Sequence, residues 1–260
     1  MSDVKKISVI VPAHNEEKFI GGCLAAIETA AKNVVQEVEM VVVLNRCSDS
    51  TAQIAKKHGA LTVTDESRCI AAVRNRGIAE ASGDVLVTCD ADSRLHPQAL
   101  VFVVDALSNP NIIGGGMPIR YDRRSPGIVA SEWCLDAAVA LTGLSAGAFW
   151  ATAEAFRAVG GFDENLLIVE DVDFAKRLKA FGKIQKKRYI CLKKAPMLTS
   201  SRKFDYFGDW SFFKMATLDA PRIWRSLKRI DTDFVDEYFH DFNDKRTVDK
   251  KTAIDDKKNH

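Results

Sequence analysis

The stretch GDVLVTCDAD, residues 83–92, decides how the rest of this sequence can fold. Five residues of strand-forming character, 85–89, run directly into Asp90 and Asp92, so the carboxyl end of a strand delivers both carboxylates to one place. That end of a strand is where open α/β sheets bind ligands. Two clustered acids repel each other unless a cation or a sugar hydroxyl accompanies them, and hard divalent ions take carboxylate oxygens together with substrate phosphates. The stretch therefore indicates a diphosphate held through a metal ion.

The same acid pair also occurs in ordinary turns, because Asp favours caps and loops, so the surrounding sequence has to decide. The β-rich runs 7–11, 38–44 and 60–64 alternate with helical patterns over the first hundred residues. Pro12 is expected to end the first run, because proline cannot donate to a central ladder. The last of these helices is expected over about 69–82, with Gly83 as its left-handed cap. Strands that alternate with helices predict an α/β fold, a mainly parallel sheet with helices on both faces.

The composition is that of an ordinary globular protein of 260 residues, with 47% hydrophobic and 28% charged residues. Lys and Arg (37) nearly balance Asp and Glu (35), so the net charge gives no argument for a nucleic-acid partner. Six cysteines without any Cys-x-x-Cys spacing indicate reduced thiols and no zinc site, which favours a cytoplasmic protein. No apolar run reaches the roughly 20 residues of a membrane-spanning helix, so we expect no transmembrane segment but leave peripheral membrane contact open.

Six short motifs follow one another along the chain: ISVIVPAHNEE (7–17), NRCSDST (45–51), AVRNRG (72–77), DAD (90–92), GGFDE (160–164) and EDVDFAKR (170–177). Each is weak alone, but together and in this order they resemble the motifs of family 2 glycosyltransferases. The resemblance implies the GT-A fold, a Rossmann-like sheet, and an inverting, metal-dependent transfer of one sugar from a nucleotide-diphosphate sugar, UDP-linked by preference, to an acceptor hydroxyl. The cofactor implied is Mn2+ or Mg2+, and the acceptor stays unknown among saccharides, lipid-linked molecules and small molecules.

The resemblance also implies roles for individual residues on the donor side. In the family, the loops after the first two strands hold the base and ribose, with Asp49 a further candidate here. Many relatives carry an acid where this chain has Asn45, so its base preference is in doubt, although an amide can still hydrogen-bond a base edge. The alternative interpretation of Arg74 is that it lies on a solvated helix face and does not contact the nucleotide. The residues expected to bind the nucleotide sugar are Pro12, His14, Glu16, Asn45, Arg68, Arg74, Asp90 and Arg202, and the expected metal ligands are Asp92 and Asp90.

A second carboxylate centre is expected at the start of the helix near residue 170. Asp171 shares the helix stripe of Phe174 and Leu178, which should face the core, and a charge there is costly without a task. The helix dipole favours acids in a first turn, and this explains one acid better than a cluster. The family resemblance makes Asp171 the base that takes the acceptor proton, with Glu170 orienting it, in a single displacement.

The middle of the chain leaves several alternatives open. The glycine-rich strand near 112–117 either approaches a ligand or packs in the sheet, and an aromatic at 148–150 could lie near the sugar. The apolar helix 128–144 packs on the core or receives a lipid-linked acceptor, and we favour packing. The basic segment 183–194 is either a strand edge that its lysines protect, or a site that attracts an anionic lipid head group or a phosphorylated acceptor. Only Arg202 matches the Gln-x-x-Arg-Trp motif of processive relatives, so we expect one sugar per acceptor.

We expect a catalytic domain over residues 1–227 and a charged tail over 228–260 without a catalytic role. In the tail, Phe234, Tyr238 and Phe242 recur every four residues, which predicts a short amphipathic helix that docks on the domain. Residues beyond 243 are expected to be disordered. Two other functions remain as alternatives: a catalytically inactive sugar-nucleotide-binding scaffold, and a nucleotidyltransferase, although the loop after the first strand lacks the glycines that the latter needs.

Overall fold

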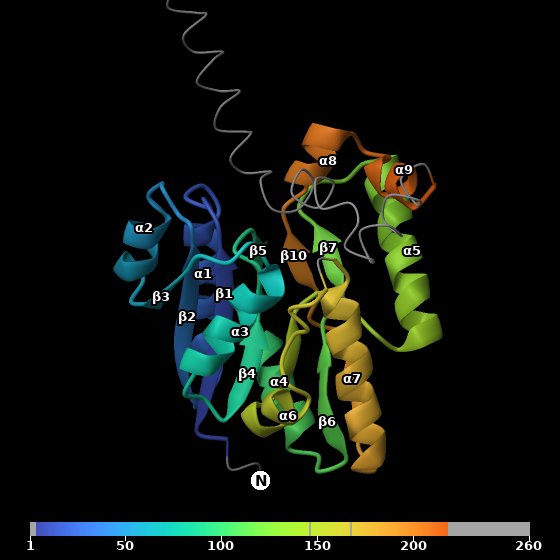
Figure 1. Cartoon of the computed structure of the whole chain (residues 1–260). Helices are drawn as coiled ribbons and strands as arrows, with labels where there is room; N and C mark the ends of the chain where they lie inside the picture. The colour runs from blue at the N-terminus through green and yellow to red at the C-terminus, as the bar shows by residue number, and fades with distance from the viewer. Residues whose placement is uncertain (1–3, 146, 167, 218–260) are drawn as a thin grey trace, which may run out of the picture.

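The structure, a computed structural model, describes residues 4–145, 147–166 and 168–217 (Figure 1). Strands and helices alternate through the first hundred residues, as expected. The elements are β1 (Lys6–Ala13), α1 (Ile20–Ala31), β2 (Glu37–Asn45), α2 (Thr51–Lys57), β3 (Leu61–Asp65), α3 (Ile70–Glu80), β4 (Val85–Thr88), β5 (Ser93–Arg94), α4 (Ala99–Leu107), β6 (Ile112–Gly116), β7 (Ile119–Tyr121), α5 (Pro126–Thr142), β8 (Phe149–Thr152), α6 (Ala153–Ala158), α7 (Glu170–Ile184), β9 (Arg188–Cys191), β10 (Met197–Thr199), α8 (Arg202–Phe207) and α9 (Ser211–Thr217).

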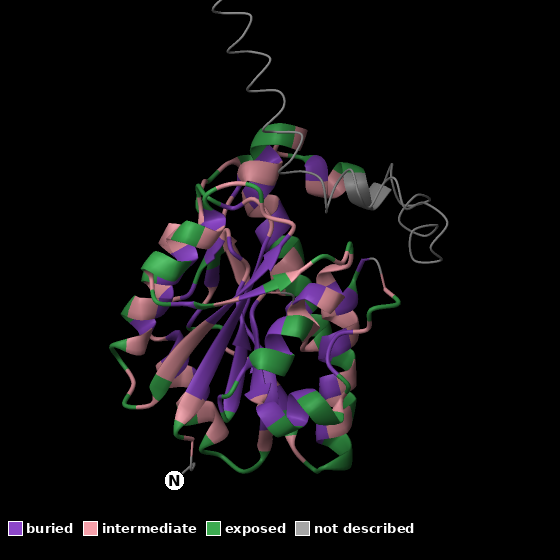
Figure 2. Cartoon of the chain, turned by 60° about the vertical axis from the view of Figure 1, so that its left-hand side comes forward, coloured by how far each residue is buried: buried purple, intermediate pink, exposed green. Residues whose placement is uncertain are grey.

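Seven strands form one sheet in the order β3-β2-β1-β4-β8-β6-β9, and β5, β10 and β7 form a second, smaller sheet. The first four strands of the large sheet run parallel, whereas β8 is antiparallel to both β4 and β6. The mainly parallel sheet predicted from the sequence is therefore confirmed. Its central strands are buried over almost their whole length, as Figure 2 shows.

Helices cover both faces of the large sheet. Along β1, Val9 and Val11 belong to the core on the side of α1 and α4, whereas Ile10 belongs to the core on the side of α3, α6 and α7. Successive strand residues point to opposite faces, so a continuous apolar strand is what a sheet covered on both faces requires. On the second side, Phe174 stacks on Phe162 with ring centroids 4.5 Å apart, and this contact ties the start of α7 to the core.

β1 continues through Pro12 to Ala13, two residues beyond the end expected from the proline. The expectation was wrong because Pro12 loses no ladder bond. The carbonyl of Ile10 accepts from Cys89 on the β4 side, and Pro12, two residues on, faces the same side, where β4 has already ended at Thr88. Pro12 still pairs in register with Val43 of β2 on the other side.

Gly83 is not a left-handed helix cap, because α3 ends at Glu80 and its C-cap, Ala81, has an extended backbone. A Cβ on Gly83 would lie 2.5 Å from the Ser8 hydroxyl and 2.6 Å from the Ser8 nitrogen. The glycine is therefore required by the close approach of this turn to β1. Similarly, the glycines of β6 pack against β8 and β9 rather than against open space, which supports sheet packing for that strand.

The basic segment after α7 contains β9, which is the edge strand of the large sheet next to β6. Lys186, Arg188, Lys193 and Lys194 are exposed around it. Exposed lysines along an edge oppose pairing with another chain, so the interpretation as a protected edge fits. None of the helices that the structure describes has both the length and the apolar character needed to cross a membrane.

We predict that Gly83→Ala lowers the free energy of unfolding by about 2 kcal/mol, because the new methyl group would overlap the backbone of Ser8. Gly21→Ala is the matched control, since a Cβ there would meet Ile54 at an ordinary 3.6 Å and alanine favours a helix. Urea unfolding followed by circular dichroism measures both. Equal stability of Gly83→Ala and the unaltered chain would contradict the close approach.

Candidate active site

Charged side chains from five separate elements gather at the carboxyl end of the sheet. They come from the loop after β1, from the residues after β4, from α3, and from the first turns of α7 and α8. Parallel strands bring their carboxyl ends to the same edge, which is why residues far apart in sequence meet there. The gathered residues are Glu16, Arg74, Asp90, Asp92, Glu170, Asp171, Arg202 and Lys203.

Arg74 joins the two carboxylate centres. One guanidinium nitrogen lies 3.0 Å from Asp90 after β4, and the other lies 2.6 Å from Glu170 at the start of α7. The side chain is only 11% exposed and lies over the ring of Phe162, so the alternative of a solvated helix face is wrong. Burial opposes its charge, but the neighbouring carboxylates, Asp90 first, outweigh burial and raise the pKa of Arg74. The two acid centres are thus held together by one permanent positive charge.

Arg202 forms a second bridge on the donor side of this edge. Its two terminal nitrogens each lie 2.7 Å from an oxygen of Glu16, in a bidentate pair, and one of them lies 3.0 Å from Asp92. Its guanidinium also lies over the ring of Phe19, 4.9 Å from the centroid. A bidentate pair fixes geometry as well as charge. The resemblance assigned Glu16, Asp92 and Arg202 to one donor site, and the structure brings all three together.

Lys203 is a member of this cluster that the sequence reasoning missed. Burial lowers the pKa of Lys203, against the attraction of Asp92. Its position next to Arg202 could have indicated that Lys203 belongs to the cluster. The sequence alone, however, does not show which face of a short helix turns toward the acids.

Two carboxyl groups have raised pKa values. Burial raises the pKa of Asp92 to about 6, with Glu16 and Asp90 adding to it and Arg202 opposing it. Burial and the charge of Glu170 raise the pKa of Asp171 to about 6, against the attraction of Arg74. In both cases burial is the main cause and neighbouring carboxylates add to it, so a further cation or a proton is favoured at each carboxyl group.

The loops after β1 and β2 are tied to each other. The Nδ1 of His14 lies 2.7 Å from the carbonyl of Asn45, and the Asn45 side-chain amide donates to the carbonyls of Asp65 (3.0 Å) and Ser67 (2.8 Å). Asn45 is only 6% exposed, so in this structure its amide holds the strand ends together instead of presenting an edge to a base. Pro12 is buried within β1 beside this loop.

Two of the expected donor residues contribute no ion pair to the acid cluster within the described residues. Arg68 is exposed before α3. Asp49 accepts hydrogen bonds from the backbone of Thr51 (3.0 Å) and Glu17 (3.0 Å). Asp49 therefore caps the start of α2 and fixes the first loop, which is a structural task.

The acid cluster has the oxygen chemistry that a hard divalent ion takes. Within the described residues, however, no three His, Cys, Asp or Glu side chains are already arranged to hold a metal. Asp92 and Asp90 could supply two carboxylates, and substrate phosphates and water would have to supply the rest. Besides burial, the neighbouring carboxylates of Glu16 and Asp90 raise the pKa of Asp92, and such a group of acids agrees with a bound cation, so the donor set fits it in part.

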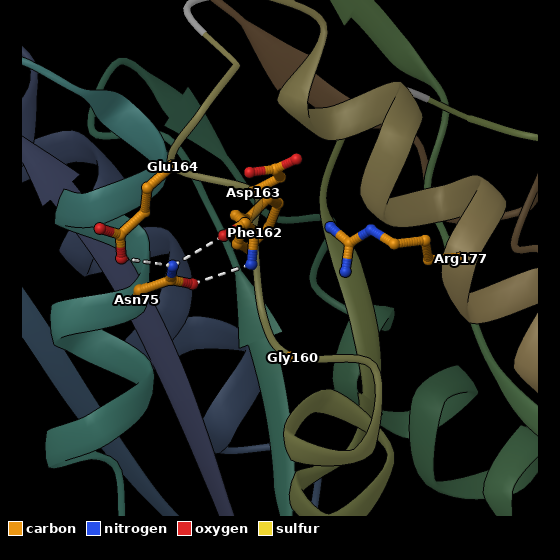
Figure 3. Close-up of a pocket in the computed structure, with 6 residues that line it drawn as sticks. All are labelled: Asn75, Gly160, Phe162, Asp163, Glu164 and Arg177. Carbon is orange, nitrogen blue, oxygen red and sulfur yellow. Dashed lines mark hydrogen bonds between the residues drawn. The ribbon is translucent and has the colours of Figure 1, made fainter.

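A shallow cleft of roughly 380 Å³ lies between α3 and the GGFDE loop (Figure 3). The side chain of Asn75 spans its wall, donating to the carbonyl of Phe162 and accepting from the nitrogen of Phe162, both at 2.8 Å. Arg177 points into the cleft from α7 and donates to the carbonyls of Val159 (2.6 Å) and Gly161 (2.8 Å). These bonds hold the loop that leads to the acids of α7.

The fold and this edge of charged side chains define a GT-A glycosyltransferase domain. Solved structures that share the fold include S. aureus TarS, with a TM-score of 0.59 and 18% identity over 78% of this chain and 38% of that chain. Another is glucosyl-3-phosphoglycerate synthase from Mycobacterium tuberculosis in complex with Mn2+, UDP-glucose and phosphoglyceric acid, with a TM-score of 0.57 and 21% identity over 82% of this chain and 78% of that chain.

The family model for glycosyl transferase family 2 matches residues 8–139, and the chain belongs to this family. Among curated relatives, glycosyltransferase AglE of Haloferax volcanii is 32% identical over 123 residues, which are 44% of this chain and 40% of AglE. Undecaprenyl-phosphate 4-deoxy-4-formamido-L-arabinose transferase of Photorhabdus laumondii is 28% identical over 130 residues, which are 46% of this chain and 39% of the relative. The chain therefore matches about two fifths of the length of these relatives.

We predict that Asn75→Ala lowers the free energy of unfolding by about 2 to 3 kcal/mol, because two backbone groups of the buried Phe162 lose their partner. Arg76→Ala is the control one residue away, since Arg76 is half exposed, pairs with Glu80 one turn further along the same helix, and should change stability by less than about 0.5 kcal/mol. Thermal unfolding by calorimetry compares the two. Similar losses in both variants would mean that Asn75 does not support the loop.

Proposed function

We propose that this chain transfers one sugar from a nucleotide-diphosphate sugar to an acceptor hydroxyl, with inversion and in a single displacement. The observation that carries the proposal is the double ion pair of Arg74, which brings a donor-side acid, Asp90, and an acceptor-side acid, Glu170, to one guanidinium. Two acid centres with different tasks must lie on opposite sides of one sugar carbon for direct displacement. An arginine that contacts both sets their separation.

On the donor side, the nucleotide is proposed to lie over the loops after β1 and β2, with its diphosphate near Asp92. A bound Mn2+ or Mg2+ would stabilise the charge that develops on the leaving diphosphate. Arg202 now pairs with Glu16 and Asp92, and its proposed task is to turn toward the diphosphate when the acids take the cation. Solved neighbours support this side: TarS was solved with UDP, and a Pyrobaculum calidifontis mannosyltransferase with GDP-Man and Mn2+. UDP is the nucleotide that we propose.

On the acceptor side, Asp171 is proposed as the base. As the acceptor oxygen bonds to the anomeric carbon and the bond to the diphosphate breaks, the hydroxyl proton passes to the Asp171 carboxylate. The pKa of Asp171, raised to about 6 by burial and by Glu170, makes it a stronger base than a solvated carboxylate while it remains ionised at pH 7. Glu170, held by Arg74, is proposed to orient the acceptor or the base.

The setting of the reaction is also a proposal. All six cysteines are free thiols, which agrees with a reducing, cytoplasmic compartment. Residues 1–227 are proposed as the catalytic unit and 228–260 as a tail outside the chemistry. Relatives named as undecaprenyl-phosphate transferases make a lipid-linked acceptor one candidate beside saccharides and small molecules.

The first test is calorimetric titration of the protein with UDP and with GDP, each with and without Mn2+. We expect metal-dependent binding of UDP that Asp92→Ala weakens by at least about tenfold, because the carboxylate nearest the proposed diphosphate is lost. Asp105→Ala, an exposed acid of α4 away from this edge, is the matched control and should bind like the unaltered chain. Absence of binding by both nucleotides would overturn the donor site, and equal binding with and without metal would overturn the metal dependence.

The base assignment predicts a distinct result for Asp171→Asn. We expect kcat to fall by about 10² to 10⁴, because general base catalysis contributes that much, while UDP affinity stays unchanged. For the unaltered chain, kcat/KM should fall as the pH drops below about 6, because a base is active only when deprotonated and the pKa of Asp171 is about 6. Steady-state rates over pH 5 to 8 measure both. A variant that keeps full activity would remove Asp171 from the chemistry.

A further inference from the structure

The outward face of α5 is apolar, and none of its exposed positions over the last ten residues is charged, although the half-buried Asp136 flanks it. Trp133 is 71% exposed and Leu141 is 88% exposed, one near each end of this face. Both carboxylates of the helix are engaged by arginines: Glu132, which is buried, pairs with Arg124, and Asp136 pairs with Arg120. The exposed positions are Trp133, Cys134, Ala137, Ala138, Ala140, Leu141 and Thr142.

A helix that faces water normally places charged and polar residues on its outer face. α5 does the reverse, since its acids are directed at arginines while a tryptophan and a leucine point outward. Exposed apolar surface of this kind marks an interaction site in a soluble protein. In Figure 1 the helix stands at the outer edge of the molecule, beside the small sheet, where a further layer could pack on it.

The sequence contains a second apolar stripe of the same length, outside the described residues. Phe234, Tyr238 and Phe242 recur at the spacing of a helix face, and Val235 and Phe239 fall beside them. The opposite face of that helix would carry Asp236 and His240, whereas Glu237 and Asp241 would flank the stripe on the side of Phe234. The stripe extends over eight residue steps, about 12 Å of helix, and so does the run from Trp133 to Leu141 on α5.

The path of the chain brings these two stripes within reach of each other. α9, the last described helix, begins next to the start of α5, where Arg123 pairs with Asp209 and Gly127 lies against the Asp209 backbone. Figure 1 shows α9 beside the upper end of α5. The sixteen residues 218–233 can span up to about 50 Å, and α5, with 17 residues, is about 25 Å long. The linker is therefore long enough to place the stripe anywhere along α5.

The charges near α5 also match the polar face of the tail segment. Lys179 of α7 donates to the carbonyl of Thr142 at the end of α5, at 2.6 Å, and Lys176 and Lys183 are exposed on the same helix. Glu237 and Asp241, at the edge of the stripe, would lie near these lysines if the segment lay along α5 with that edge toward α7. An acidic segment fits this position better than it fits an anionic membrane.

We propose that residues 234–242 form an amphipathic helix that packs its aromatic stripe on the apolar face of α5, defined by Trp133, Ala137 and Leu141. The docked segment covers the apolar face, places Glu237 and Asp241 at its edge and leaves Asp236 and His240 in water. The interaction is intramolecular, so the linker supplies a high effective concentration and a modest contact is enough for occupancy.

Cys134 lies on this face and reports whether it is covered. The full-length chain is labelled with N-ethylmaleimide, and the rate at Cys134 is followed by peptide mass spectrometry. We expect labelling to be about tenfold faster in Tyr238→Asp, because the aromatic contact is lost and the face opens. His240→Asp, which adds the same charge on the opposite side of the predicted helix, is the control and should label at the rate of the unaltered chain.

The reciprocal variant tests the same contact from α5. Leu141→Asp should release the segment, which we expect to appear as faster amide hydrogen exchange in peptides that contain residues 234–242. Ile184→Asp is its control, because Ile184 is a similarly exposed apolar residue, 78% exposed, at the end of α7. Unchanged exchange after Leu141→Asp would overturn the proposal.

Other occupants of the face give different results, and each overturns the proposal. Equal labelling of Cys134 in the unaltered chain and in Tyr238→Asp, with slowing only on vesicles of phosphatidylcholine and phosphatidylglycerol, would assign the face to a lipid surface. Labelling that slows as protein concentration rises, with sedimentation as a dimer, would assign it to a second copy. If Cys134 of the unaltered chain reacts with N-ethylmaleimide as fast as a small thiol in solution does, the face of α5 is uncovered.

Discussion

Repulsion among carboxylates is the constraint on which the rest of the charged edge depends. Five acids gather at the carboxyl end of the sheet, and a buried charge without a partner is costly. Arg74 and Arg202 each bridge two of these acids, so each guanidinium neutralises charge and also fixes the distance between elements. Burial, with the help of neighbouring carboxylates, still raises the pKa values of Asp92 and Asp171 to about 6. The edge is thus stable enough to form and still attracts cations or protons.

The alternation of strands and helices could be predicted because every central strand is buried on both faces and therefore reads as a short apolar run. The position of β8 could not, since nothing in residues 149–152 shows that this strand inserts antiparallel between β4 and β6. Pro12 and Gly83 were misjudged for a related reason. Each was interpreted by its local preference, whereas the end of β4 and the backbone of Ser8 decide what each residue does.

The sequence predicts which residues lie at the carboxyl edge of the sheet, but not which of their side chains contact one another. A motif places Asp90 after a strand and Asp171 at a helix start, and the topology then brings those positions to one edge. Which side chains meet depends on rotamers and on neighbours distant in sequence, so no motif shows that Arg74 bridges Asp90 and Glu170. For the same reason Asn45 was expected to face a ligand, although its amide is engaged by Asp65 and Ser67.

The pair between Glu16 and Arg202 connects positions 186 residues apart, near the two ends of the described chain. A ribosome makes the chain from its amino end, so the loop after β1 emerges long before α8 exists. Until α8 is made, Glu16 and Asp92 lack their counter-charge, and contacts of such large sequence separation form late because of the entropy of closing the loop. The donor side of the edge therefore matures only when nearly the whole domain has been synthesised.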